Sequence, residues 1–380
     1  MNVERYRRAA TIAFSFEAGV FAGGNFYTGT YEKLDPRHVA VLDALRDWRT
    51  AEELADHPVF AGDAGFASHA LESLVKAGLA VRESDPPEQA RAFAEHWREW
   101  GLGTQIYHAT SRDAPYTETQ PQAQQVYKEM VEQPLPPPPA LKSYPDAPRI
   151  ELPRDLPPLD VSLETVLASR RTWRAFTGGE VALRRLSKLL LVSFGATGRA
   201  EAGEYGQLLF KTSPSGGARH PTEAYVVALA CEGVPAGLYH YDPAGHALEQ
   251  LGLGDHRGDV IRWLANQYWF QGSAVVIFTT VVVRRLSFKY KHGRAYRVLL
   301  MDQGHLGQTF VLAATALGLG AWQTAAFHDT EVEAALGIDG IEETAVYALG
   351  AGITPIPTVY PGKTVELWTG PPKRLELPPP

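Results

Sequence analysis

Residues 213–231 read SPSGGARHPTEAYVVALAC, a loop with two consecutive glycines followed by an apolar run. The apolar run is typical of a buried β-strand. The Pro-Ser-Gly-Gly turn at 214–217 can bring main-chain N–H groups against a flat ligand, because glycine lacks the Cβ that would hold the ligand away. An ordinary turn would have the same composition. The loop by itself therefore leaves a ligand site and a simple turn as alternatives.

Further strand signals follow this loop along the chain. They are GLYHYD (237–242), SAVVIFTTVVV (273–283), GAWQTAAF (320–327) and TAVYALGAG (344–352). Helices are predicted at 163–169, 182–193 and 294–317. The last of these is apolar on most faces and rich in glycine and alanine, so we expect it to be buried on all sides. The pattern predicts an α+β domain with a layer of helices.

Proline divides the chain into two folding units. Ten of the 28 prolines lie in 134–158, where fixed φ angles and missing N–H donors exclude a helix or a central strand. This stretch is expected to be a stiff, extended linker. The predicted organisation is a domain at 1–85, a helical connector at 86–133, the Pro-rich linker at 134–158 and a second domain at 159–380.

Composition excludes several classes of protein. The 380 residues carry a net charge of -7, which offers no basic excess for a nucleic acid. The single cysteine, Cys231, excludes an intramolecular disulfide and fits a reducing, cytoplasmic setting. The longest apolar stretch is interrupted by polar residues and the N-terminal one is too short, so no membrane role is predicted.

The first 85 residues have the pattern of a winged-helix-like domain. Thr50 and Glu53 form a capping box, and a short strand at 79–82 follows three predicted helices. Between Asp35 and Asp85 we count ten acidic and five basic residues. This acidity favours docking of a peptide or a protein over contact with DNA. Downstream, a loop is expected around Tyr107 and His108, and His108 is interpreted as structural, so no metal site is predicted.

Three segments carry candidate chemistry. Residues 169–174 (SRRTWR) place three guanidiniums and two hydroxyls together, which suits a phosphate dianion, although an arginine cluster is more often a solvated face. Residues 287–297 (SFKYKHGRAYR) form either a surface stretch or a loop facing a cleft. Residues 318–321 (GLGA) are either a helix C-cap or backbone facing a ligand. Neither GxGxxG nor GxxxxGK[ST] occurs, so Rossmann and P-loop signatures are absent from the sequence.

Taken in order, the motifs resemble those of a known family. RRTWRAF, PSGGARHPTEAY, KYKHGRAYRVLLMDQGHLGQ, ALGLGAWQTAAF and ALGAG occur in register between about residues 144 and 352. This order resembles the nitroreductase-like FMN flavoproteins and, within them, the SagB/McbC-type azoline dehydrogenases. The resemblance implies a homodimer with the flavin at the subunit interface. It also implies oxidation of thiazolines and oxazolines in ribosomally made peptides.

The resemblance also implies the site. FMN would be held through its phosphate by Arg170, Arg171 and Thr172, where the family more often has serine, with Arg174 less clearly matched. The remaining cofactor positions implied are Pro214, Ser215, Gly216, Gly217, Gln308, Gly318, Leu319 and Gly320. Lys373 or Arg374 could match basic C-terminal residues that reach the phosphate in many nitroreductases, although the Pro-rich tail around them departs from that pattern.

Lys289 and Tyr290 match the Lys-Tyr pair regarded as catalytic in the azoline dehydrogenases. Aromatising an azoline removes a proton from one ring carbon and a hydride from its neighbour, so a base must stand beside the flavin. Reference pKa values of about 10 for Tyr and 10.4 for Lys mean that either base would need lowering by about three units. Which of the two residues is the base stays open.

These inferences predict an FMN-dependent azoline dehydrogenase that acts on a precursor peptide, with a cyclodehydratase as a candidate partner. A general NAD(P)H-dependent nitroreductase or quinone reductase is the alternative enzyme. A peptide-binding scaffold without flavin is the alternative outside catalysis.

Overall fold

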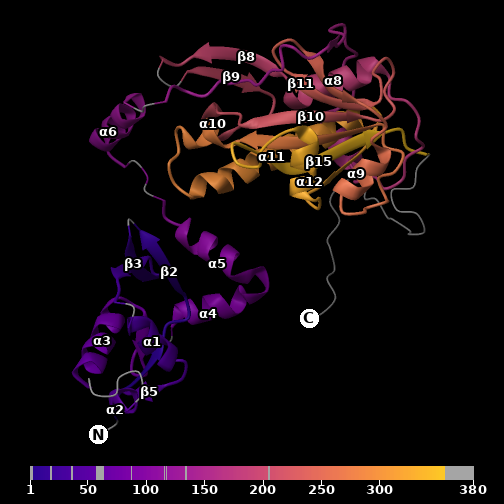
Figure 1. The fold of residues 1–380 in the computed structure, drawn as a ribbon. Coiled ribbons are helices and arrows are strands. Elements are labelled where there is room, and N and C mark those ends of the chain that lie inside the picture. The colour runs from indigo at the N-terminus through magenta and orange to yellow at the C-terminus, as the bar shows by residue number, and fades with distance from the viewer. Residues whose placement is uncertain are drawn as a thin grey trace. The chain divides into compact units, whose positions relative to one another are not determined.

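A computed structural model describes residues 3–355, apart from residues 18, 36, 57–63, 87, 115, 117, 133–134 and 204–205. The chain forms two compact units, Met1–Tyr116 and Thr117–Pro380, whose elements are labelled in Figure 1. The N-terminal unit extends beyond the boundary expected at residue 85. Ala10 N donates to Glu88 Oε1 at 2.8 Å, and Arg112 Nη2 donates to the carbonyl of Tyr27 at 3.0 Å, so the helices after residue 85 belong with this unit.

The N-terminal unit contains two small antiparallel sheets. One has the order β5-β1-β6, built from β1 (Arg5–Arg8), β5 (Arg49–Thr50) and β6 (Ala80–Arg82). The other is a meander of β2 (Ile12–Glu17), β3 (Val20–Asn25) and β4 (Thr30–Lys33). Helices α1 (Arg37–Ala44), α2 (Ala51–Ala55) and α3 (Ala64–Lys76) share one core that includes Leu45, Leu54, Leu74 and Leu79. The predicted capping box is confirmed, because Thr50 and Glu53 exchange both hydrogen bonds.

Three short helices complete this unit. They are α4 (Gln89–His96), the 3₁₀ turn η2 (Arg98–Trp100) and α5 (Gly101–Thr110). The loop expected around Tyr107 and His108 is wrong, because both residues lie in α5. The helix forms because Gln105 and Ala109 lie buried on one face, four residues apart. The ring of His108 lies 4.0 Å from that of Trp97, centroid to centroid, which fits its structural interpretation.

The second unit begins with α6 (Gln120–Val131), which is exposed along its described side chains. The Pro-rich stretch that follows lies along the second unit. The carbonyl of Pro139 accepts a hydrogen bond from Arg285 Nε at 2.8 Å, and Lys142 Nζ lies 2.6 Å from Glu343 Oε2. Its last part, β7 (Arg149–Glu151), pairs with β12 at the edge of the main sheet, where a proline-rich segment is tolerated.

The centre of the second unit is a seven-stranded antiparallel sheet with the order β14-β15-β13-β10-β11-β12-β7. Its other strands are β10 (Thr222–Ala228), β11 (Gly237–Asp242), β12 (Ala247–Leu253), β13 (Val275–Val282), β14 (Gly320–Thr324) and β15 (Glu343–Gly352). A separate ribbon is made by β8 (Ala196–Glu201) and β9 (Gln207–Lys211). The strand signals read from the sequence thus correspond to β10, β11, β13, β14 and β15.

Helices cover both faces of this sheet (Figure 1). One face packs on α8 (Leu183–Phe194) and α11 (Arg294–Ala316), and α7 (Leu163–Ser169) adds to the same layer. The opposite face packs on α9 (Arg257–Trp263) and α12 (Asp329–Leu336). Alternate residues of β10 serve the two cores: Val226 points to the first and Tyr225 to the second. The α+β class expected from the sequence is confirmed.

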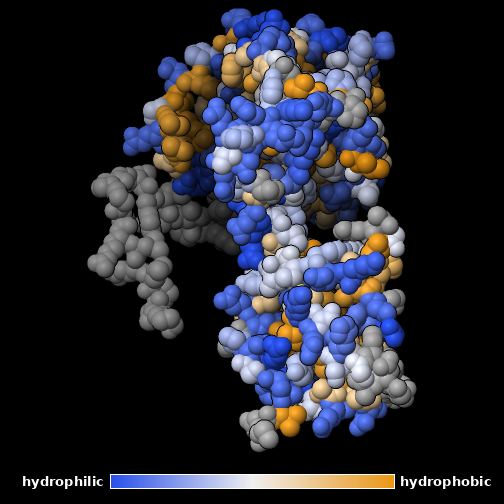
Figure 2. Space-filling view, turned by 90° about the vertical axis from the view of Figure 1, so that its left-hand side faces the viewer, coloured by the Kyte–Doolittle hydropathy of each residue, from blue (hydrophilic) through white to orange (hydrophobic). Residues whose placement is uncertain are grey.

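The long helix α11 differs from expectation in its burial. Leu306 and Phe310 pack into the core, but Tyr296, Leu300 and Met301 are exposed. Burial on all sides is therefore wrong for the single chain, because the sheet and α8 cover only one side of the helix. Much of the face of the molecule drawn in Figure 2 is hydrophilic, with hydrophobic side chains gathered in small patches.

Candidate functional site

The glycine loop between β9 and β10 is tied to α11 by a buried carboxylate. Ser215 Oγ donates to Asp302 Oδ2 at 2.6 Å, and Gly216 N donates to Asp302 Oδ1 at 3.2 Å. His220 N donates in turn to Ser215 Oγ at 2.9 Å. Burial raises the pKa of Asp302, against the opposing effect of these hydrogen bonds. One side chain of α11 therefore fixes the backbone of the loop.

The two glycines of the loop are closely packed. A Cβ on Gly216 would overlap Val298 of α11. Gly217 has a φ of 61°, and its Cβ would lie 2.5 Å from Tyr290 Oη and 3.1 Å from Lys289 Nζ. The positive φ favours glycine at position 217, and a Cβ there would force the Tyr290 side chain to move. The sequence indicated that the backbone of this loop could be closely approached by a flat ligand. In the structure, two side chains of the protein itself lie close to the backbone of Gly217.

Lys289 and Tyr290 follow Phe288, the C-cap of α10 (Val283–Ser287). Their backbone N–H groups both donate to the carbonyl of Leu286, at 3.2 and 3.0 Å, which turns the chain at this point. Lys289 Nζ lies 5.3 Å from the centroid of the Tyr290 ring. Adjacent residues point apart in regular structure, but this turn lets both half-buried side chains reach Gly217.

Arg219 is a residue that the sequence did not single out as a site residue. It is 6% exposed, and its Nε donates to the carbonyl of Arg285 at 3.1 Å. Burial lowers the pKa of Arg219, while the nearby Tyr290 opposes that shift. The buried guanidinium therefore lies close enough to Tyr290 for the two groups to interact. The signal that could have found it is the arginine in the sequence Gly216-Gly217-Ala218-Arg219, two positions after the paired glycines.

The arginine-rich segment 169–174 leaves the end of α7. Arg171 Nη1 donates to the carbonyls of Ala168 and Arg170, at 2.8 and 2.6 Å. Thr172 forms a parallel bridge with Ala321, and Trp173 N donates to the carbonyl of Ala321 at 2.9 Å. The structure thus brings this segment beside the 318–321 loop, 150 residues further along the chain.

The 318–321 loop closes the end of α11. Gly318 has a φ of 69° and follows the C-cap Leu317, so it serves at least as the C-terminal glycine of the helix. Leu319 is buried, and a Cβ on Gly320 would lie 2.9 Å from Trp173 Cγ.

Two other predicted cofactor positions, Gln308 and Arg174, are exposed to solvent. Gln308 is exposed on α11, and the Arg174 guanidinium lies 5.6 Å from the ring centroid of Trp269. Lys373 and Arg374 lie outside the described residues.

Buried polar groups of β10, β11, β12 and α10 pair with one another. Glu223 Oε1 pairs with Arg285 Nη1 at 2.5 Å, and His240 lies between Glu223 and Glu249. Burial lowers the pKa of Lys211 to about 8, and burial together with Lys211 lowers that of His220 to about 4.

Two buried amide oxygens lack a donor within the described part of the chain. They are Gln303 Oε1 and Gln323 Oε1. Gln303 Nε2 donates to Thr222 Oγ1 at 2.7 Å, which fixes that amide. An amide oxygen left without a donor is suited to accept a hydrogen bond from a bound group.

No group of three or more metal-ligating side chains occurs in the described ranges. Cys231 is buried, and burial raises the pKa of its thiol to about 12. Within residues 3–355, with the gaps given above, every helix falls short of the length and apolar character needed to cross a bilayer.

The comparisons with known proteins agree with this fold. The model of the nitroreductase family matches residues 167–353. The "Putative nitroreductase MJ1384" of Methanocaldococcus jannaschii is 33% identical over 179 residues, which cover 47% of this chain and 86% of that protein. The chain belongs to the nitroreductase family, and this membership indicates an oxidoreductase.

Two further relatives are named as proteins that process peptides. The "Trifolitoxin-processing protein TfxB" of Rhizobium leguminosarum bv. trifolii is 32% identical, over 44% of this chain and 46% of its own length. The "Microcin B17-processing protein McbC" of Escherichia coli is 27% identical, over 42% of this chain and 58% of its own length. The chain thus spans about half the length of these two relatives. The resemblance to SagB/McbC-type members, drawn from the motifs, is confirmed.

Proposed function

We propose that this protein is an FMN-dependent, O₂-reoxidised azoline dehydrogenase, which converts thiazolines or oxazolines of a ribosomally made peptide to thiazoles or oxazoles. The observation that carries this proposal is the convergence of Lys289 Nζ and Tyr290 Oη on Gly217 in the glycine loop. Two relatives whose names describe them as processing peptides support a peptide substrate.

The residues present fit a flavin phosphate. Among the described residues, no hydrogen bond or ion pair engages the Arg170 guanidinium, and the Arg171 guanidinium uses one nitrogen on two carbonyls. Two planar cations and the Thr172 hydroxyl are a donor set that suits a phosphate dianion. The unsatisfied amide oxygens of Gln303 and Gln323 suit the N–H donors of a heterocycle. When bound, FMN would supply the two-electron acceptor.

The side chains of Lys289 and Tyr290, beside Gly217, would accept the proton released from the azoline ring. Oxidation of each ring removes one proton and one hydride, so a base must take the proton while the flavin accepts the hydride. Tyr290 and Lys289 are the candidate bases, since both reach the same point of the loop. Arg219 is a buried cation that interacts with Tyr290, so it would add positive charge beside the Lys-Tyr pair.

The N-terminal unit would dock the precursor peptide or a cyclodehydratase partner. Its sheets and the helices α1 to α3 are compatible with a winged-helix-like domain, in which an extended peptide can add to a sheet edge. The exposed apolar residues of α11 suit a homodimer, which light scattering of the purified protein would reveal.

Mass spectrometry of azoline peptides after incubation with the protein tests the function directly. The expected result is a loss of two hydrogens per ring, and a protein with the visible absorbance of bound flavin. Unchanged peptides across thiazoline and oxazoline substrates, incubated with flavin-loaded protein, would contradict the proposal. A colourless protein that binds no added FMN would favour the non-catalytic scaffold.

A general NAD(P)H-dependent reductase is the second candidate. It is favoured by the similarity to MJ1384, which the chain covers over 86% of that protein's length. Anaerobic mixing with NADPH in the absence of peptide separates the two functions. Rapid bleaching of the flavin indicates the reductase, whereas bleaching only by an azoline peptide indicates the dehydrogenase.

A further inference from the structure

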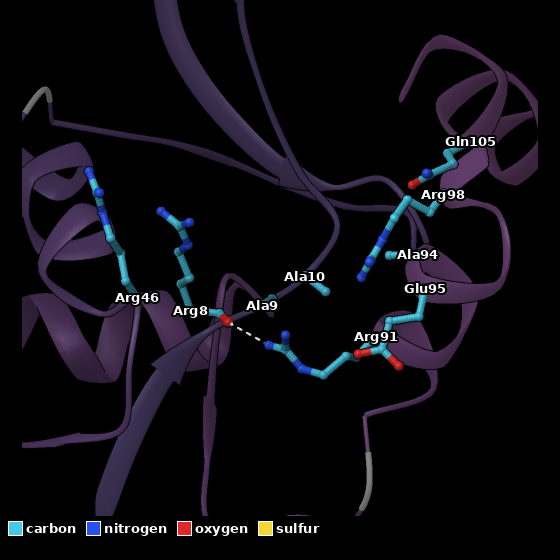
Figure 3. Close-up of a pocket in the computed structure, with 9 residues that line it drawn as sticks. All are labelled: Arg8, Ala9, Ala10, Arg46, Arg91, Ala94, Glu95, Arg98 and Gln105. Carbon is cyan, nitrogen blue, oxygen red and sulfur yellow. Dashed lines mark hydrogen bonds between the residues drawn. The ribbon is translucent and has the colours of Figure 1, made fainter. Parts of the chain in front are cut away.

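The N-terminal unit holds a cavity of about 330 Å³ lined by four arginines. Figure 3 shows Arg91 and Arg98 directed toward the space in front of Ala9 and Ala10, with Arg8 on the other side. We call this cavity the arginine pocket: it comprises Arg8, Arg46, Arg91 and Arg98, with Glu95 as the one carboxylate on its wall. Its volume lies at the lower end of the range of about 300–1,000 Å³ for small-ligand clefts.

Four separate elements supply the arginines. Arg8 ends β1, Arg46 follows α1, Arg91 lies in α4 and Arg98 begins η2. Arg91 Nη2 donates to the carbonyl of Arg8 at 3.3 Å, and this bond joins α4 to the central strand of the sheet. The pocket is therefore a product of the tertiary fold.

Positive charge in the pocket is only partly neutralised. Arg46 pairs with Asp43, and Arg91 pairs with Glu88 at 3.2 Å. Within the described residues, the guanidiniums of Arg8 and Arg98 make no ion pair or hydrogen bond. Burial, and after it the charge of Arg91, lower the pKa of the neighbouring Arg7, while nearby carboxylates act in the opposite direction. An anion in the pocket would relieve this repulsion.

The surroundings restrict the kind of anion. The segment 35–85 has twice as many acidic as basic residues, so a long polyanion lying across it would be repelled, and an anionic ligand should be short enough to contact the arginines alone. Backbone donors at the pocket are already used, since Ala9 N donates to Leu79 O and Ala10 N donates to Glu88 Oε1. Recognition must therefore come from guanidinium side chains, which bind carboxylates in a planar, two-point geometry.

We propose that the arginine pocket binds carboxylate side chains of an acidic segment of the precursor peptide. This inference rests on the peptide-modifying function proposed above. It assigns to the N-terminal unit a side-chain contact that is separate from addition of a peptide strand to a sheet edge. The acidic segment would be held by Arg8 and Arg98, the two arginines whose charge is not otherwise paired.

The test uses the full-length, flavin-loaded protein and a fluorescently labelled hexapeptide of glutamate. Fluorescence anisotropy should show binding at low salt, and a labelled hexapeptide of glutamine should bind at least about tenfold more weakly. The double variant Arg8→Gln, Arg98→Gln should weaken binding of the glutamate peptide by about tenfold or more. Lys76→Gln removes an exposed charge elsewhere on the unit and should change binding by less than about twofold.

Two results would contradict the proposal that the arginine pocket binds an acidic peptide. One is equal affinity of the double variant and the wild type, with circular dichroism showing that both are folded. The other is competition by inorganic pyrophosphate at lower concentration than by unlabelled glutamate peptide, which would identify a small phosphate site instead.

The same proteins separate this inference from the proposed function. A short azoline peptide without acidic residues should be oxidised equally by the wild type and the double variant. If no azoline is oxidised while the glutamate peptide still binds through Arg8 and Arg98, the azoline dehydrogenase assignment fails and the pocket's preference for acidic peptides stands. If azolines are oxidised but the double variant binds the glutamate peptide normally, the pocket assignment alone fails.

Discussion

Asp302 in α11 accepts a hydrogen bond of 2.6 Å from the hydroxyl of Ser215, which lies in the loop between β9 and β10. The same carboxylate accepts the N–H of Gly216 at 3.2 Å. Since Asp302 is 3% exposed, water does not readily replace it as the acceptor. The geometry of the candidate site therefore depends on a single buried carboxylate.

Replacing Asp302 by alanine should lower the free energy of unfolding. The variant leaves the Ser215 hydroxyl and the Gly216 N–H without their acceptor, which costs about 1–3 kcal/mol. Urea unfolding followed by circular dichroism measures the change. Asp160→Ala, at an exposed position, is the control and should unfold like the wild type. Equal stability of both variants would contradict the structural role of Asp302.

Gly217→Ala should reduce azoline turnover more than its effect on stability would explain. The new Cβ would lie 2.5 Å from Tyr290 Oη, so the tyrosine must move. Gly337→Ala is a matched control, because Gly337 has a similar φ of 69° but open space around its Cβ position. Both variants should lose about 1 kcal/mol of stability through the positive φ. Only the change at Gly217 should lower turnover, and equal turnover would argue against a role for the position of Tyr290.

Lys289→Gln and Tyr290→Phe should each keep the flavin and lose turnover. Removal of a general base typically costs about 10²- to 10⁴-fold in rate. Peptide oxidation by mass spectrometry gives the rate, and the flavin spectrum shows whether the cofactor is retained. Lys291→Gln changes the charge at the exposed neighbouring position and should turn over normally. If both site variants retained full activity, the assignment of this pair would be wrong.

Arg170→Gln and Arg171→Gln should weaken FMN binding. A hydrogen bond to a charged group contributes about 1.5–3 kcal/mol, so each loss should raise the Kd by about tenfold or more. Quenching of flavin fluorescence on binding provides the measurement. Arg184→Gln is the control, since this exposed arginine pairs with Asp155 on the surface of the same unit. An unchanged Kd in both test variants would place the phosphate elsewhere.

Stability should fall with rising pH through the titration of His240. Burial acts to lower the pKa of His240, but hydrogen bonds and charges from Glu223 and Glu249 outweigh it and raise the pKa. A raised pKa contributes stability in full below the unfolded value of about 6.5, and the contribution is lost as pH rises through the folded value. Each unit of the shift corresponds to about 1.4 kcal/mol.

The measurement is the difference in unfolding free energy between the wild type and His240→Gln, taken from pH 6 to pH 9. Glutamine is neutral throughout, so the wild type should lose stability relative to the variant over this range. A constant difference would show that the charge on His240 does not contribute.

Local sequence determined much of the second unit. The apolar runs that became β10, β11, β13, β14 and β15 are marked by their own composition, because a strand buried on both faces needs apolar residues at nearly every position. The capping box at Thr50 is equally local. The order of five motifs was enough to indicate the nitroreductase family, and the match over 167–353 agrees with it.

Only the tertiary structure decided which residues meet. Asp302 reaches the glycine loop from α11, and Arg219, within the loop, donates to the carbonyl of Arg285; local sequence does not specify these partners. The exposed side of α11 could not be predicted, because burial depends on what packs against a helix.

In the N-terminal unit, the distribution of charge along the sequence differs from its distribution in space. Counting residues along 35–85 gives an acidic segment, yet the fold draws Arg8, Arg46, Arg91 and Arg98 around one cavity. Composition along the chain is a sum over neighbours in sequence, whereas electrostatic potential is a sum over neighbours in space. The sequence by itself therefore determined the central strands of the second unit and the family, and long-range packing decided where charged side chains gather.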